Sequence, residues 1–192
     1  MRSLVVYESM YGNTHLLADH IAEGLRVHGE VSVVSVADAT DEDVASADLV
    51  VVGGPTHAHG MTSATSRKSA VDAAAKSDGT LHLDAAAAGP GLRDWFDELG
   101  PVVDKRAAAF DTRIDTTAIL TGRASRGISH RLSKRGFTMV SHPESFLVDR
   151  HSSLLEGESD RATKWGEELG HQYQWPPVAD DPDFHEGVGR TP

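Results

Sequence analysis

Residues 4–27 read LVVYESMYGNTHLLADHIAEGLRV, and this stretch decides the fold. Its first four residues are apolar or aromatic and predict a short buried strand. The segment from His15 to Val27 is expected to form an amphipathic helix, because apolar residues recur every four positions along it, at Leu17, Ile21 and Leu25. A polar turn therefore joins a first strand to a first helix.

That turn, Ser9-Met10-Tyr11-Gly12-Asn13-Thr14, has the features of an anion site. The first N–H groups of a helix have no internal partner and carry the positive end of the helix dipole. Gly12 allows the backbone to curl closely around a phosphate, and the side chains of Ser9, Asn13 and Thr14 add polar groups. The alternative is that these residues only cap the helix.

The hexapeptide SMYGNT resembles the phosphate-binding loop of flavodoxins, which has the form Thr/Ser-x-Thr-Gly-x-Thr. Tyr11 stands where the family has a small hydroxyl residue, so the phosphate is expected to rely more on backbone N–H groups. No Gly-Lys-Ser/Thr follows, as it would in a nucleoside triphosphatase, and the dinucleotide pattern Gly-x-Gly-x-x-Gly is absent.

Strand-like and helix-like segments alternate along most of the chain, which predicts an α/β fold. The resemblance implies a doubly wound five-stranded parallel sheet, flavodoxin-like, in the order 2-1-3-4-5. Strands are expected near 4–8, 31–36, 49–52, 107–111 and 137–141, the last resuming at 146–148 after an interruption. Helices are expected near 14–27, 64–76, 91–99, 124–135 and 156–171, and a short turn or helix near 41–46.

We expect one domain over residues 1–171, which is also the extent of the resemblance. The stretches VVYESMYGNT, VVGGPTHAHGM and PESFLV carry it. Residues 172–192 contain Trp175-Pro176-Pro177 and several acidic residues, and are expected to form an acidic, extended or disordered tail.

Two further loops should complete the site, because ligands of such sheets bind at the carboxyl ends of the strands where the strand order reverses, a rule of which flavodoxin is itself a standard example. The third strand is followed by Pro55-Thr56-His57-Ala58-His59-Gly60, which resembles the family's loop around the ribityl chain and one side of the isoalloxazine. The fourth strand leads into Asp111-Thr112-Arg113, where the family supplies backbone N–H groups to the pyrimidine edge. The alternative in each case is an ordinary polar loop.

The aromatic residues of these later loops depart from the family pattern. Typical flavodoxins hold the ring between a Trp and a Tyr, and these loops contain neither. His57, His59 or Met61 would then have to stack on the ring.

Composition narrows the chemistry. The chain has no cysteine, which excludes thiolate-bound iron–sulfur clusters and cysteine nucleophiles, so a bound organic cofactor would have to carry any electrons. Its histidines are scattered, and no metal site is predicted. The net charge of −11 argues against nucleic acid or an anionic membrane as partners. It fits docking on a basic protein surface, although solubility alone would also explain it.

No apolar run reaches the length of about 18 residues that a membrane span needs. The first residues lead into a strand without the pattern of a signal peptide, so a cytoplasmic location is expected. A homodimer is one further partner that the sequence leaves open.

Three functions remain open. The resemblance implies an FMN-binding electron-transfer protein with a basic redox partner and no catalytic residue. An FMN-dependent NAD(P)H or quinone-type oxidoreductase is the second, with His57 and His59 as proton donors. The third is a flavodoxin-like binding or regulatory module that has lost FMN.

Overall fold

The structure is a computed structural model that describes residues 1–57, 60–77, 79, 81–117 and 121–174. Within these residues, one sheet contains β1 (Arg2–Tyr7), β2 (Glu30–Ser35), β3 (Leu49–His57), β4 (Gly60–Met61), β5 (Arg106–Ile114), β6 (Thr138–Met139) and β7 (Glu144–Val148). The helices are α1 (Asn13–Leu25), α2 (Asp41–Ser46), α3 (Ala64–Ala75), α4 (Leu92–Glu98), α6 (Ala124–Lys134) and α7 (Glu158–Gln174). A short 3₁₀ turn, η1 (Arg26–His28), continues α1.

The sheet has the predicted doubly wound topology. Its strand order is β2-β1-β3-β5-β6, and these strands are parallel. β7 also pairs in parallel with β5, from Phe110↔Glu144 to Ile114↔Val148, so β6 and β7 are the two parts of the interrupted fifth strand. With β5 counted as the fourth strand, the predicted order 2-1-3-4-5 is confirmed.

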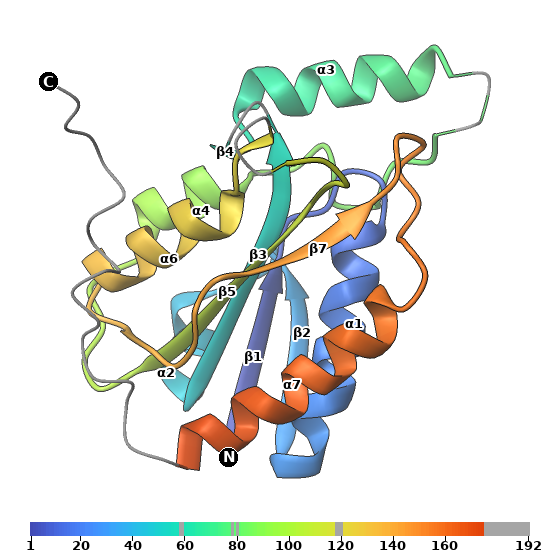
Figure 1. Ribbon diagram of the computed structural model, residues 1–192. Coiled ribbons are helices and arrows are strands. Elements are labelled where there is room, and N and C mark those ends of the chain that lie inside the picture. Colours follow the sequence, from blue (N-terminus) through green and yellow to red (C-terminus); the bar gives the residue numbers. More distant parts are fainter. Residues whose placement is uncertain (58–59, 78, 80, 118–120, 175–192) are drawn as a thin grey trace, which may run out of the picture.

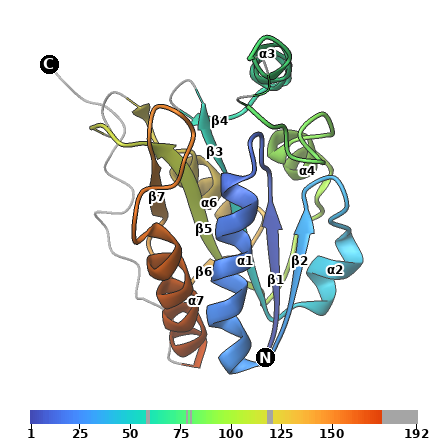
Figure 2. The ribbon, with the colours of Figure 1, turned by 90° about the vertical axis from the view of Figure 1, so that its right-hand side faces the viewer.

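Helices cover both faces of the sheet (Figures 1 and 2). One apolar cluster joins α1 and α7 to one face, including Val5 and Val51, and a second joins α2, α4 and α6 to the other, including Val50 and Val52. Both faces of the central strands are therefore buried, which explains why their apolar runs are continuous rather than alternating.

The two helices of the first face touch through their backbones. A Cβ atom on Gly24 of α1 would lie 2.0 Å from the Thr163 carbonyl oxygen, and one on Gly166 of α7 would lie 2.2 Å from the Ile21 carbonyl oxygen. Only glycine fits at these two positions. The contact fixes α1, and with it the turn that precedes α1, against the last helix of the described chain.

Residues 62–91, which we call the arm, leave the body of the fold at the carboxyl end of the sheet. The arm contains α3, which lies beyond that end rather than on a face of the sheet (Figures 1 and 2). Ala70 is the buried residue of α3 and packs with Met10 and Ala87, against which Tyr11 also lies. The short helix α4 covers the sheet face in its place, with Trp95 and Phe96 in the core.

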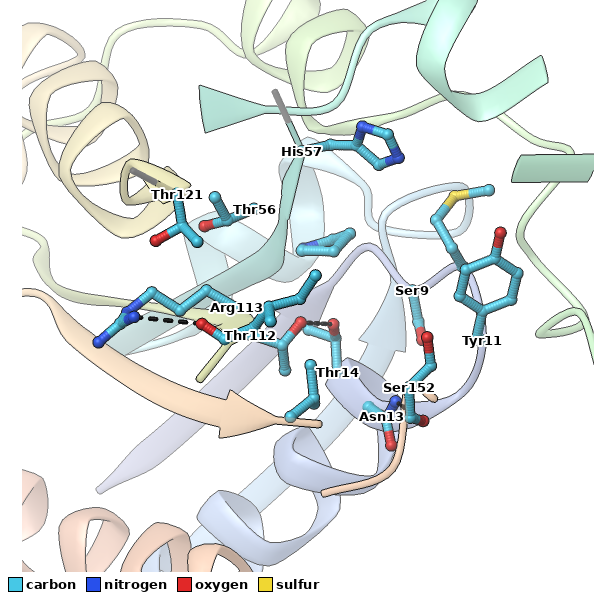
Figure 3. Close-up of a pocket in the computed structure, with 14 residues that line it drawn as sticks. Ser9, Tyr11, Asn13, Thr14, Thr56, His57, Thr112, Arg113, Thr121 and Ser152 are labelled. Carbon is cyan, nitrogen blue, oxygen red and sulfur yellow. Dashed lines mark hydrogen bonds between the residues drawn. The ribbon is translucent and has the colours of Figure 1, made fainter. Parts of the chain in front are cut away.

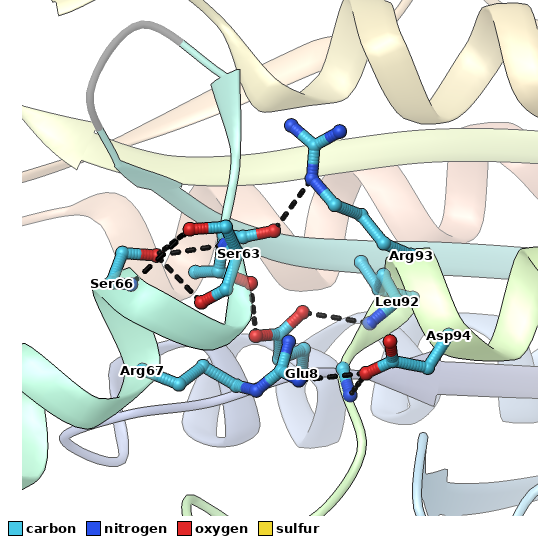
Figure 4. Close-up of polar contacts among 9 residues, drawn as sticks. Glu8, Ser63, Ser66, Arg67, Leu92, Arg93 and Asp94 are labelled. Atoms are coloured by element: carbon cyan, nitrogen blue, oxygen red, sulfur yellow. Dashed lines mark hydrogen bonds and ion pairs between the residues drawn. The ribbon is translucent and has the colours of Figure 1, made fainter.

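A buried carboxylate holds the base of the arm (Figure 4). Glu8, which follows β1, is 4% exposed and accepts a hydrogen bond from the Leu92 N–H at 2.8 Å and another from the Thr62 hydroxyl. Arg67 pairs with Asp94 at 2.7 Å beside it. Both ends of the arm are therefore tied to the residue that leads into the polar turn.

The predicted helices and strands are present, mostly with small shifts of their ends. β3 is longer than predicted and ends at His57 rather than Val52, so Pro55, Thr56 and His57 belong to the strand and not to the loop after it. α7 continues to Gln174, and the rest of the predicted tail lies outside the described residues. Among the helices that the structure describes, none is long and apolar enough to cross a membrane.

Candidate functional site

A pocket of about 320 Å³ opens at the carboxyl ends of β1, β3 and β5, where the strand order reverses (Figure 3). This is the place at which sheets of this topology bind ligands, and the volume lies within the range of small-molecule sites. The pocket is lined by Ser9, Met10, Tyr11, Asn13, Thr14, Pro55, Thr56, His57, Thr112, Arg113, Ile114, Thr121, Val148 and Ser152.

The backbone of the first turn leaves donors for an anion. Gly12 has φ +89°, in the left-handed region that favours glycine, and its carbonyl accepts the Leu16 N–H at 2.9 Å as the first bond of α1. The N–H groups of the first helical residues therefore have no partner within the helix, and no side chain in the described chain caps it. A Cβ atom on Gly12 would meet nothing within 4 Å, so the space beside the turn is open.

The polar side chains of the same turn mostly hold the walls together. The Ser9 hydroxyl accepts the Gly12 N–H at 3.1 Å. The Asn13 amide donates to the Ser152 carbonyl at 2.6 Å, and the Thr14 hydroxyl bonds that of Thr112 at 2.9 Å (Figure 3). The capping alternative considered from the sequence does not describe this helix start, because none of these side chains makes a capping hydrogen bond to α1.

The last residues of β3, which the sequence placed in a loop after the strand, provide the opposite wall. Pro55, Thr56 and His57 line the pocket, and the Thr56 hydroxyl accepts the Ala124 N–H at 2.8 Å. Gly60 lies in β4 and does not line it. Ala58 and His59 lie outside the described residues.

The aromatic environment differs from the family pattern, and one of the three expected stacking residues, Met61, is not part of it. Met61 is 8% exposed and packs in the core near α6, because β4 folds back on β3 with Thr56 opposite Met61, so it does not reach the pocket. Among the described lining residues the rings are those of Tyr11 and His57. Tyr11 donates its hydroxyl to the Ala70 carbonyl at 3.3 Å, so the arm helps to place this ring.

Some residues at the end of β5 line the pocket, and others are buried in the interior. Thr112 and Arg113 line the pocket, and the Arg113 guanidinium donates to the Thr116 carbonyl at 2.6 Å. Asp111 does not line it. This carboxyl is fully buried behind the wall and accepts the Ser125 N–H at 2.7 Å, and burial raises its pKa above the ordinary value.

Sequence reasoning missed the lining residues Ile114, Thr121, Val148 and Ser152. Ser152 lies in a turn that the Asp149 carboxylate closes by accepting the His151 and Ser153 N–H groups, each at 2.8 Å. An aspartate followed by serines is a local turn signal. Nothing local indicates that this turn meets Asn13, 139 residues away.

The donor set fits a flat ligand with a phosphate group. The open start of α1 suits the phosphate, hydroxyls of Thr56 and Thr112 lie farther along the pocket, and Ile114, Val148 and Pro55 supply apolar walls. In the part of the chain that the structure describes, no three His, Cys, Asp or Glu residues are grouped to hold a metal ion.

Comparisons with known proteins agree with this geometry. A family model described as Flavodoxin matches residues 5–169. A curated flavodoxin from Aquifex aeolicus (strain VF5) is 46% identical over 56 residues, which is 28% of this chain and 30% of that protein. The chain thus matches less than a third of that relative's length.

Solved structures share the fold at low sequence identity. Flavodoxin 2 from Bacillus cereus superposes with a TM-score of 0.63 at 19% identity, covering 90% of this chain and 99% of that one. Flavodoxin 1 from Bacillus cereus gives 0.60 at 20% identity, with 88% and 97% covered. At these identities the likeness shows the fold alone.

Proposed function

The chain belongs to the flavodoxin family, whose members bind FMN and transfer electrons, and on that basis we propose that it is an electron carrier with FMN in the pocket described above. The observation that carries the proposal is the start of α1, open beside the left-handed Gly12 and without a side-chain cap among the described residues. Such a helix start binds phosphate by its backbone N–H groups and dipole.

Each wall has a role in this proposal. The N–H groups of Asn13 and Thr14 hold the phosphate, while the Thr14–Thr112 bond ties the first turn of α1 to the end of β5 beside it. Tyr11 and His57 flank the ring, and Arg113 offers positive charge within the same pocket. When bound, FMN supplies the redox chemistry that a chain without cysteine lacks.

The redox partner is proposed to dock through a basic surface, because the chain has a net charge of −11. The rate of electron transfer should then fall as salt is added. A homodimer and a cytoplasmic location are also part of the proposal. Sedimentation at several protein concentrations tests the first, and cell fractionation tests the second.

The test begins with the visible spectrum of the purified protein, followed by titration with FMN and with riboflavin. We expect flavin bands, and tighter binding of FMN than of riboflavin, since riboflavin lacks the phosphate. Absence of FMN binding at micromolar concentration would refute the proposal. Steady NAD(P)H oxidation without an added reductase would favour the oxidoreductase, which the family match does not.

A further inference from the structure

A buried polar cluster lies directly behind the pocket. It joins side chains from β5, α6, β7 and β3, namely Asp111, Ser125, Ser145 and Thr56. Asp111 and Ser125 are both 0% exposed, and Asp111 lies opposite Ser145 in the sheet. Oxygens and N–H groups are seldom gathered in a core without pairing, so this cluster needs an explanation.

The carboxyl of Asp111 is only half satisfied. Its Oδ2 atom accepts the Ser125 N–H at the start of α6, whereas Oδ1 has no hydrogen-bond partner among the described residues. The hydroxyls of Ser125 and Ser145 are likewise buried and unpaired in that part of the chain. A carboxyl with one free oxygen beside hydroxyls that can either donate or accept is able to hold a proton at Oδ1.

No described side chain forms an ion pair with Asp111. The charged or titratable residues on the surrounding elements include Arg113 on β5, Glu144 on β7, His57 on β3 and Arg123 before α6. Arg113 donates to backbone carbonyls, and Glu144 pairs with Arg161 at 2.6 Å. The side chains beside the carboxyl are therefore hydroxyls, and burial raises its pKa more than the Ser125 N–H and these neighbouring hydroxyls lower it.

Two residues connect this carboxyl to the pocket. Thr56 lines the pocket and also lies beside the Asp111 carboxyl, and Thr112, the next residue along β5, lines the pocket as well. Asp111 is thus one layer of residues behind the wall. Charge placed in the pocket therefore acts on the Asp111 carboxyl through protein rather than through water, and electrostatic interactions are stronger in protein than in water.

We propose that Asp111 is a redox-linked proton site, which binds a proton from solvent at Oδ1 when negative charge is added in the pocket on reduction and releases it on oxidation. The inference rests on the proposed function. One O–H bond forms or breaks at the carboxyl, and the electrons come from the protein reductase that the proposed function requires. Asp111 touches no ligand itself, so it acts on the site through the wall.

The experiment measures the midpoint potential of the FMN-loaded protein against pH for the parent, Asp111→Asn and Asp115→Asn. The asparagine keeps an oxygen for the Ser125 N–H, and the control removes an exposed carboxylate from the same end of β5. Uptake of one extra proton on reduction changes the equilibrium constant for reduction tenfold per pH unit. For a two-electron couple this adds about 30 mV per pH unit to the slope of the midpoint potential. We expect this added slope in the parent and in Asp115→Asn, and its loss in Asp111→Asn.

A second readout follows the carboxyl directly. Carbon NMR of aspartate-labelled protein, assigned with Asp111→Asn, should show the Asp111 resonance titrating above the ordinary range and shifting upward again on reduction. If Asp111→Asn does not fold, Ser145→Ala provides the test, because it removes a hydroxyl that lowers the Asp111 pKa. The pH range in which the midpoint potential has the added slope should then move to higher pH.

The outcomes separate the two proposals. Failure to bind FMN refutes the electron carrier, and with it the redox link. FMN binding with equal slopes in the parent and Asp111→Asn, or an Asp111 resonance that ignores reduction, leaves the carrier intact and refutes the proton site. Asp111 would then only cap α6.

Discussion

Replacing Gly12 with valine tests whether the open start of α1 is the phosphate site. The chain offers a matched control, because Gly157 precedes α7 in the same way. Gly12 has φ +89° and Gly157 has φ +83°, and each carbonyl accepts the fourth following N–H at 2.9 Å. A Cβ atom would meet nothing within 4 Å at either position.

The two substitutions should cost the same stability. A side chain in the left-handed region costs about 1–2 kcal/mol, so urea unfolding of the FMN-free variants should show similar losses for Gly12→Val and Gly157→Val. Their effects on ligand binding should differ. Gly157 does not line the pocket, whereas valine at position 12 displaces N–H groups from the phosphate.

A hydrogen bond to a charged group contributes about 1.5–3 kcal/mol, which corresponds to roughly a 10- to 150-fold loss of affinity. Fluorescence titration should therefore show FMN weakened by that factor in Gly12→Val and riboflavin almost unchanged. Gly157→Val should bind both as the parent does. Equal weakening of FMN and riboflavin, or the same loss of FMN in the control, would refute the phosphate assignment.

Three other predictions concern the walls of the pocket. Thr14→Val should lower the free energy of unfolding by about 1–2 kcal/mol, since it leaves the Thr112 hydroxyl unpaired. The double variant with Thr112→Val should lose less stability than the sum of the two single variants, and additive losses in urea unfolding would argue against the bond. His57→Ala should shift the midpoint potential while changing the FMN dissociation constant less than about threefold, and an unchanged potential would remove His57 from the ring. The parent should lose stability relative to Asp111→Asn as pH rises from the pKa of an aspartate in the unfolded chain, about 3.9, to the raised pKa of Asp111 in the folded protein, because the buried carboxyl must then ionise. The difference in the free energy of unfolding should change by at most about 1.4 kcal/mol per pH unit, and a pH-independent difference would contradict a raised pKa.

The sequence was most informative where one local pattern decided the structure. Continuous apolar runs predicted the buried parallel strands, and an interruption of the fifth strand was expected over 142–145, of which Glu144 and Ser145 already belong to β7. The placement of α3 could not be predicted in the same way. Its alanine-rich sequence indicates a helix but has no strong apolar stripe to select a face of the sheet, while Trp95 and Phe96 give α4 that stripe.

The site was harder to predict where contacts are long-range. Asp111 was grouped with Thr112 and Arg113 by position, but its side chain is buried and accepts the Ser125 N–H at the start of α6, a contact between residues on two different elements. Ser152 belongs to the pocket through a bond to Asn13, which depends on the whole sheet and on α7 being in place. Such contacts follow from topology rather than from any local spacing.

The backbone contact between α1 and α7 has a consequence for biosynthesis. α1 leaves the ribosome early, but the helix that packs on it through Gly24 and Gly166 is the last one described, and Ser152, which holds Asn13, is made only shortly before that helix. A nascent chain that ends before α7 therefore lacks the support of its own first turn. The pocket is accordingly expected to reach the form that binds FMN only after the segment up to Gln174 is free to fold onto α1.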